Sequence, residues 1–499
     1  MSLKQTIVSA VGWFVAVKVS VQLVTWAMTL VVIRILSPDD YGLMAVSQIF
    51  VNFMLGFGSL GFGDALVQQG ETSRMVVARL FGVLLVSALV LGALMALAAY
   101  PIGAWYHDPR LVPLIQVSSL GFLFTALTAL PRAYLTKHLK VRPMFIMELS
   151  SGLAGAAAVI LLAFGGYGVW SLMLGWLTTN VVKLLGFVLL ASEYYTWPRF
   201  GIAGIGPLFS FGIYRTFEYI VWMIFASADI LIISCLLGPV EVGVYVVASN
   251  FATMPLNKIA PIVNATAFPA FALVQERPSE ARFYALKAVR MMAAIAVPLF
   301  FGLAVTAPEV VDLVFGPHWA AARPVLGVLA LAVTFRAILL VVPNFLQGIG
   351  DSRASFWCSA IGALIFPPAF IIGCHWGIVG VAWAWLLGYP IMYAASAMIA
   401  SRRGGLNTRL LLLAPVQPII AGCIMMGAVA TTRPLLSDTL PEAVSFAILV
   451  MVGATTYGGV LLLLFRGLAM EVLKIFRRAA SAADAPMHDP GLSPVKSQD

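Results

Sequence analysis

Long uninterrupted apolar runs are the feature that most constrains what this chain can fold into. About fourteen runs reach the length of about 20 residues that a helix needs to cross a bilayer. Backbone groups in lipid must be bonded internally, so only helices or a closed barrel can span it, and runs of this length predict helices. With 61% hydrophobic and 10% charged residues, most of the 499-residue chain must lie in lipid. We therefore expect an all-α polytopic membrane protein with spans near 8–33, 42–68, 76–100, 112–135, 146–164, 167–190, 206–236, 243–270, 285–307, 323–347, 355–374, 377–400, 408–430 and 442–465.

The basic residues divide unevenly between the connections that alternate along the chain. One set of connections, together with the two termini, holds nearly all of them, whereas the other set holds only Arg34, Arg110, Arg323 and Arg433. Connections rich in Lys and Arg remain in the cytoplasm. The pattern predicts a multi-pass protein with both termini cytoplasmic, and it explains the net charge of +9 without a nucleic-acid partner.

Two pairs of turn motifs indicate an internal repeat. The segment 36–42 (LSPDDYG) parallels 237–243 (LGPVEVG), and 167–170 (YGVW) parallels 376–379 (WGIV). Both pairs have an offset of about 200 residues, or six spans, so the two halves should have the same orientation. The predicted organisation is an N-terminal lobe at 1–200, a C-terminal lobe at 201–403, two further helices at 404–466, and a cytoplasmic tail at 467–499 that is amphipathic and then disordered.

The predicted helix at 206–236 carries charges at membrane depth. Arg215, Glu218 and Asp229 fall on one stripe of this helix. Such charges usually face a bundle interior or a water-filled cavity. A structural ion pair between Arg215 and Glu218 remains open as the simpler interpretation. The two acids are also candidates for coupling transport to H⁺ or Na⁺.

Polar stripes on the first two spans point to the same kind of cavity. Lys18 and Gln22 begin a stripe on the first span, which a row of polar side chains alone would explain as contacts between helices. The lysine near mid-span favours a cavity. Asn52 belongs to a weaker stripe on the second span, and Asp64 lies off that stripe as a structural or gating charge.

The eighth and tenth spans add further cations. Asn257 lies on a polar face of the eighth span, and Lys258 follows it about 15 residues into the span, too deep for a lysine that extends to the membrane surface. Arg336 lies deep in the tenth span. Cations within the spans outnumber acids, so the cavity should attract an anion such as a pyrophosphate or an acidic sugar.

Several classes of site are excluded by the absence of their motifs. No G-x-x-x-x-G-K-[ST] motif is present, so the chain does not itself drive transport with ATP. No histidine has metal-ligand spacing, and we expect no metal site and no cofactor other than a coupling ion. The four cysteines lie in apolar runs without C-x-x-C spacing, which predicts buried free thiols.

Four motifs together resemble one known family. They are the segments at 34–45 (RILSPDDYGLMA), 61–69 (GFGDALVQQ), 255–261 (PLNKIAP) running into 268–271 (FPAF), and 313–319 (LVFGPHW). With them, the chain resembles the Wzx-type polysaccharide-unit flippases of the multidrug/oligosaccharidyl-lipid/polysaccharide exporter superfamily, in particular the colanic-acid-type members. The resemblance covers nearly the whole chain.

The resemblance implies a function and a site. It implies two pseudo-symmetric six-helix lobes around a central cavity, with two appended helices, in the bacterial inner membrane. The implied substrate is an oligosaccharide repeat unit on undecaprenyl pyrophosphate, with a glycan polymerase and a chain-length regulator as further partners. Lys18 and Lys258 match in kind the basic residues that related flippases place on cavity faces, and Asp229 corresponds to an acid that the family places before the Leu-Gly-Pro turn. Arg215 and Arg336 have no motif behind them.

Two other functions remain as alternatives. A cation-coupled multidrug exporter of the same superfamily would more naturally have an acidic cavity for cationic drugs. A membrane glycosyltransferase or glycan polymerase would normally need a sizeable outward loop with catalytic groups, and the sequence has none. We therefore expect a flippase that works by alternating access for exopolysaccharide or lipopolysaccharide biosynthesis, and not an enzyme.

Overall fold

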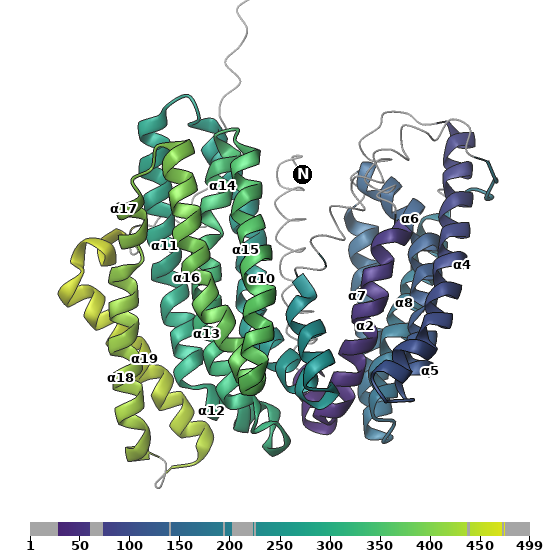
Figure 1. Cartoon of the computed structure of the whole chain (residues 1–499), viewed down its shortest axis with the longest axis horizontal. Coiled ribbons are helices and arrows are strands. Elements are labelled where there is room, and N and C mark those ends of the chain that lie inside the picture. Colours follow the sequence, from purple (N-terminus) through teal and green to yellow (C-terminus); the bar gives the residue numbers. More distant parts are fainter. Residues whose placement is uncertain are drawn as a thin grey trace, which may run out of the picture. The chain divides into compact units, whose positions relative to one another are not determined.

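The protein is described by a computed structural model that covers residues 28–59, 73–138, 141–192, 195–201, 223, 226–436, 440–471 and 474 (Figure 1). Every regular element in these parts of the chain is helical. Residues 28–35 and Ala226–Leu236 are helical, and they precede turns that lead into longer helices. The remaining elements are α2 (Pro38–Ser59), α4 (Arg74–Trp105), α5 (Leu111–Ser118), α6 (Leu120–Lys137), α7 (Val141–Phe164), α8 (Val169–Leu190), α10 (Pro239–Leu273), α11 (Pro278–Val305), α12 (Ala307–Val310), η2 (Val311–Phe315), η3 (Pro317–Trp319), α13 (Ala322–Leu339), α14 (Val341–Gly348), α15 (Ser352–Gly373), η4 (Cys374–Trp376), α16 (Gly377–Gly404), α17 (Thr408–Leu413), α18 (Val416–Leu436) and α19 (Glu442–Leu464).

The predicted membrane character is confirmed. Within the described residues, 9 helical segments are long and apolar enough to cross a membrane, and one of them, Arg353–Gly404, contains both α15 and α16. The protein is therefore an all-α multi-pass membrane protein. The count of fourteen spans stays a prediction, because the first and seventh predicted spans lie largely outside the described residues.

Three predicted spans are each divided into two helices, among them the run at 323–347, which forms α13 and α14. The run at 112–135 forms α5 and α6, and the hydroxyl of Ser119 between them donates to the carbonyl of Gln116 (2.7 Å), a bond that bends helices. The run at 408–430 forms α17 and α18, which part at Pro415. Proline has no N–H to donate to the carbonyl of Leu411, which accepts from the Tyr393 hydroxyl (2.7 Å) and the Ala414 amide (3.2 Å) instead.

The start of α2 shows why the chain turns into a helix at this point. The Asp40 amide donates to Ser37 Oγ (3.3 Å), while the Ser37 amide and hydroxyl donate to Asp40 Oδ2 (3.0 and 2.7 Å). This reciprocal pair is a capping box, which satisfies backbone donors that the first turn leaves free. Pro38 occupies the first helical position, where its missing N–H costs nothing.

The turn motifs of the predicted repeat share their local structure. α2 begins at Pro38 and α10 begins at Pro239, the matching prolines of the first motif pair. In the second pair, Gly168 (φ 54°, ψ −132°) and Gly377 (φ 69°, ψ −161°) both have positive φ immediately at the start of the next helix. Only glycine adopts this conformation without strain. The matching backbone supports the repeat.

Packing divides the chain into two compact units. The first contains Met1–Met254, Ala307–Ala332 and Ala360–Gly388, and the second contains Pro255–Thr306, Val333–Ser359 and Tyr389–Asp499. In the second unit, α18 and α19 pack together and against α11 (Figure 1). The predicted lobe boundaries at residues 200 and 403 stay a prediction.

The cysteine prediction is only half correct. All four thiols are free, and Cys358 and Cys374 are buried, but Cys235 and Cys423 are exposed. An apolar run does not show which of its residues face the rest of the protein, so it could not separate these two exposed cysteines from the buried pair.

Candidate functional site

Half of the predicted site residues can be located in the structure. Those that lie outside the described residues are Lys18, Gln22, Asp64, Arg215 and Glu218. Those that the structure places are Asn52, Asp229, Asn257, Lys258 and Arg336.

The polar face of α10 is exposed, as a cavity wall requires. Asn250, Asn257 and Asn264 lie on one face of this helix and are exposed, and Lys258 beside them is exposed as well. The buried residues of α10, such as Tyr245, lie on a face roughly 120° away. A row of amides and an ammonium group is costly against lipid, so this face belongs beside water or a polar ligand.

An asparagine on another helix holds Asn264, at the end of this polar face. Asn344 on α14 donates from Nδ2 to Asn264 Oδ1 (2.8 Å) and to the carbonyl of Leu340 (2.8 Å). Lys258 lies six residues before Asn264, about 9 Å along the helix. Arg336 is exposed and lies eight residues before Asn344, about 12 Å along its chain. The second unit therefore presents Lys258 on α10, which this bond holds, and Arg336 on α13, which directly precedes α14.

Asn52 is partly buried on α2. One turn earlier on the same predicted stripe, the amide nitrogen of Gln48 is buried and has no hydrogen-bond partner among the described residues. Such an unsatisfied donor is costly, so this stripe is suited to a polar ligand.

Asp229 lies in a buried network in the first unit. The residue is only 6% exposed, and its carboxylate accepts hydrogen bonds from the Ile230 amide (2.8 Å), the Tyr245 hydroxyl (2.7 Å) and the Trp385 indole (3.2 Å). The indole also donates to the Tyr245 oxygen (2.8 Å). The acid is thus held between helix Ala226–Leu236, α10 and α16.

Sequence reasoning missed Tyr245 and Trp385. Both residues lie within apolar helices, where an aromatic ring normally indicates packing. Their polar atoms were the available signal, because a buried tyrosine or tryptophan usually bonds with its hydroxyl or N–H. The sequence alone cannot show which of the many such residues meets Asp229.

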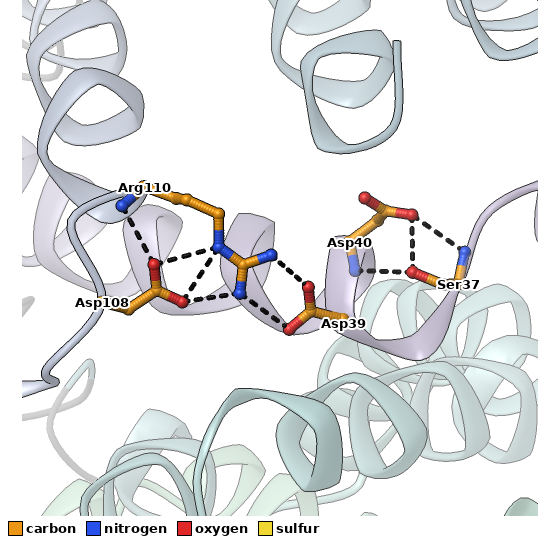
Figure 2. Close-up of polar contacts among 5 residues, drawn as sticks. All are labelled: Ser37, Asp39, Asp40, Asp108 and Arg110. Carbon is orange, nitrogen blue, oxygen red and sulfur yellow. Dashed lines mark hydrogen bonds and ion pairs between the residues drawn. The ribbon is translucent and has the colours of Figure 1, made fainter. Parts of the chain in front are cut away.

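A second ionic cluster joins α2 to the α4–α5 connection (Figure 2). The guanidinium of Arg110 bonds to Asp39 (2.6 Å) and Asp108 (2.7 Å), and Arg110 is 56% exposed. Hydrogen bonds from the Arg110 side chain hold the pKa of Asp108 below its usual range, and the Asp108 and Asp39 side chains raise the pKa of Arg110. The cluster fixes the loop to the start of α2.

No metal centre is visible in the part of the chain that the structure describes. Its His, Cys, Asp and Glu residues form no group of three or more that could hold an ion.

Comparison with known proteins settles the family. Residues 31–324 match the family described as "Polysaccharide biosynthesis protein". The chain belongs to this family. The match begins just before the 34–45 motif and ends just after the 313–319 motif, so it includes the four motifs singled out above.

Individual relatives extend the similarity over the rest of the chain. The chain is 27% identical over 492 residues to the succinoglycan biosynthesis transport protein ExoT of Rhizobium meliloti, covering 96% of this chain and 98% of that protein. It is 26% identical over 389 residues to the lipopolysaccharide biosynthesis protein WzxC of Escherichia coli, covering 78% and 79%. The fold resembles the lipid II flippase MurJ in its inward closed conformation, with a TM-score of 0.70 and 15% identity over 90% of this chain and 98% of that one. At that identity, the likeness shows the fold alone.

Proposed function

We propose that the protein is a flippase that moves undecaprenyl-pyrophosphate-linked oligosaccharide repeat units across the bacterial inner membrane by alternating access. The observation that carries the proposal is the near full-length similarity to a succinoglycan biosynthesis transport protein, together with the family match. The flipped units supply exopolysaccharide or lipopolysaccharide biosynthesis. A glycan polymerase and a chain-length regulator receive them on the outer side, and both termini face the cytoplasm.

The pyrophosphate group is bound by cations and amides on the helices around the cavity. Lys258 and Asn257 on the exposed face of α10 supply donors, and Arg336 adds a guanidinium suited to bidentate bonds with phosphate oxygens. Lys18, Gln22, Asn52 and Arg215 complete the proposed substrate-binding set. The lipid tail remains in the bilayer while the headgroup crosses.

Acidic residues serve coupling or structure. Asp229 is the proposed coupling acid, because its carboxylate is buried and its donors come from separate helices. Glu218 and Asp64 are further candidates, and H⁺ or Na⁺ is the coupling ion. In this proposal, each transport cycle depends on whether Asp229 is charged or neutral.

The test uses a strain whose chromosomal copy has been deleted. Lys258→Ala and Lys18→Ala should each lower glycan export at least tenfold without changing the amount of protein in the membrane, because each removes a charged hydrogen bond to the substrate. Lys287→Ala is the matched control, since Lys287 pairs with Glu471 (4.0 Å) and lies outside the proposed site. Full complementation by both site variants would refute the site. Drug resistance without glycan export would favour a multidrug exporter instead.

A further inference from the structure

Two of the family motifs, far apart in the sequence, bond to one another. The guanidinium of Arg34 donates from Nε to the carbonyl of Val314 (3.1 Å) and from Nη2 to the carbonyl of Leu313. These carbonyls belong to the last turn of η2, where helical carbonyls lack partners within the helix and carry partial negative charge. A cation there is the natural cap.

The neighbouring residues of the same motifs add a buried contact. Trp319 is fully buried, and its indole N–H donates to the carbonyl of Ile33 (2.9 Å). The ring of Tyr41 meets the ring of Trp319 edge-on, with centroids 5.5 Å apart. The 34–45 and 313–319 motifs, with Ile33 beside the first, therefore form one contact.

A second hydrogen bond joins the same parts of the chain. The Tyr106 hydroxyl, just beyond α4, lies 2.7 Å from Ser234 Oγ and 3.6 Å from Cys235 Sγ. Ser234 is only 3% exposed. All these residues belong to the first compact unit, and each bond joins a residue before 110 to one after 230.

We propose that these contacts form an outer gate, which closes the outward end of the transport pathway and must open once in every transport cycle. The outer gate is defined by Ile33, Arg34, Tyr41, Tyr106, Ser234, Leu313, Val314 and Trp319. The inference rests on the proposed function, because alternating access requires the repeats to separate at each membrane face in turn. The distribution of basic residues places these connections on the outward side.

The chemistry of the outer gate suits repeated opening. Its hydrogen bonds are few, and most acceptors are backbone carbonyls or hydroxyls that water can satisfy when the contacts part. Arg34 is exposed, so its guanidinium can be solvated by water when the outer gate opens. Loss of one charged hydrogen bond should raise the open population about tenfold.

The first experiment measures opening without using the substrate. Ser234→Cys is introduced in a background whose four native cysteines are alanine, and intact cells are treated with a membrane-impermeant maleimide. The buried thiol reacts only when the outer gate opens, so its labelling rate reports the open population. Arg34→Ala and Trp319→Phe should each raise this rate about tenfold, and Arg34→Lys should raise it less.

The control is Arg433→Ala. Arg433 also donates to a backbone carbonyl, that of Val305, but both residues belong to the second compact unit. This variant should leave the labelling rate unchanged. The proposal is overturned if Arg34→Ala and Trp319→Phe label at the control rate, if the parent thiol is already labelled rapidly, or if no variant is labelled.

A second experiment connects the outer gate to export. Tyr106→Cys is combined with the native Cys235, the other cysteines being alanine, and a reducible bis-thiol reagent links the two across the contact. Linked protein should lose glycan export, and reduction should restore it. Full export by linked protein contradicts the requirement for opening. Tenfold faster Ser234→Cys labelling in a protein that exports no glycan would instead refute the proposed function and leave the gate standing.

Discussion

At the scale of single residues, Asp229 shows how a membrane protein keeps an acid away from water. An ionised carboxylate in an apolar interior is tolerated only with charge partners or several donors. Asp229 has a backbone amide, a tyrosine hydroxyl and an indole N–H. The Tyr245 and Trp385 donors lie on α10 and α16, two helices other than that of Asp229. A change in the charge of Asp229 therefore alters the contacts between helices.

Asp229→Asn should abolish export while lowering the thermal midpoint less than Asp229→Ala does. Its amide oxygen can still accept from Tyr245 and Trp385 but cannot be ionised, and its NH2 group cannot accept from the Ile230 amide as the carboxylate does. Asp229→Ala should lower both export and stability, since it leaves the buried Tyr245 hydroxyl without its acceptor, at a cost of about 1–3 kcal/mol. Export assays and thermal unfolding of the purified variants separate these effects. Normal export by Asp229→Asn would assign the carboxylate a purely structural role.

The ion cluster at Arg110 predicts a pH dependence of stability. Arg110 lowers the pKa of Asp108, so the ionised acid stabilises the fold at pH values above the ordinary aspartate pKa of about 3.9. That contribution is lost as the pH falls through the lowered value. The difference in thermal stability between the natural protein and Arg110→Ala should therefore be constant from about pH 5 to 8 and shrink below about pH 4.

The effect at Arg110 should be small, below about 1 kcal/mol, because its guanidinium is 56% exposed and screened by solvent. Asp108→Asn is the control. It is combined with Asp39→Asn, so that both carboxylates bonded to Arg110 are removed, and Arg110→Ala in that background should show no change of effect between pH 7 and pH 3. A difference that grows as the pH falls would contradict the assignment.

At the scale of helices, two tyrosine hydroxyls bond to backbone carbonyls that a proline leaves without their usual helical partner. Pro298 within α11 cannot donate to the carbonyl of Ala294, and the Tyr457 hydroxyl on α19 donates to it instead (3.1 Å). Pro415 and Tyr393 stand in the same relation to the carbonyl of Leu411. A carbonyl left open in lipid costs several kcal/mol, so these bonds also fix which helices pack together.

Tyr457→Phe should therefore destabilise the protein by about 1–3 kcal/mol, because it leaves the Ala294 carbonyl unpaired. Adding Pro298→Ala should recover part of this loss, since an alanine amide at position 298 can bond to Ala294 within the helix. Thermal unfolding of the single and double variants measures the coupling. A double variant less stable than Tyr457→Phe would show that the freed carbonyl is not the cause.

The sequence predicted helices far better than their contacts. Apolar runs predicted a span at 377–400, and α16 occupies Gly377–Gly404. Length and hydropathy are properties of one segment, so they can be read locally. The partners of Asp229 and Arg34 are set by packing between segments up to 280 residues apart, and no local pattern records them. The break between α17 and α18 could be predicted from Pro415. The Tyr393 hydroxyl that bonds to the Leu411 carbonyl could not.

At the scale of the whole molecule, the repeat explains how the start of α2 packs against the start of α10. Gly42 and Gly243 occupy the same position in the matching motifs of α2 and α10. A Cβ on Gly42 would overlap the carbonyl of Pro239, and a Cβ on Gly243 would overlap the carbonyl of Pro38. The two helix starts thus cross with backbone against backbone, in a reciprocal contact of the kind that a pseudo-two-fold axis produces.

Gly42→Ala and Gly243→Ala should have nearly equal effects, because each methyl group pushes against the equivalent carbonyl of the other repeat. The obstacle is backbone rather than a flexible side chain, so the helix starts must separate, at a cost of about 1–3 kcal/mol. Each variant should lower the thermal midpoint and speed labelling of Ser234→Cys. The matched control is Gly302→Ala, a helical position with no atom within 4 Å of the added methyl, which should be neutral or slightly stabilising. Unequal effects of the two variants would show that the crossing is not shared symmetrically by the repeats.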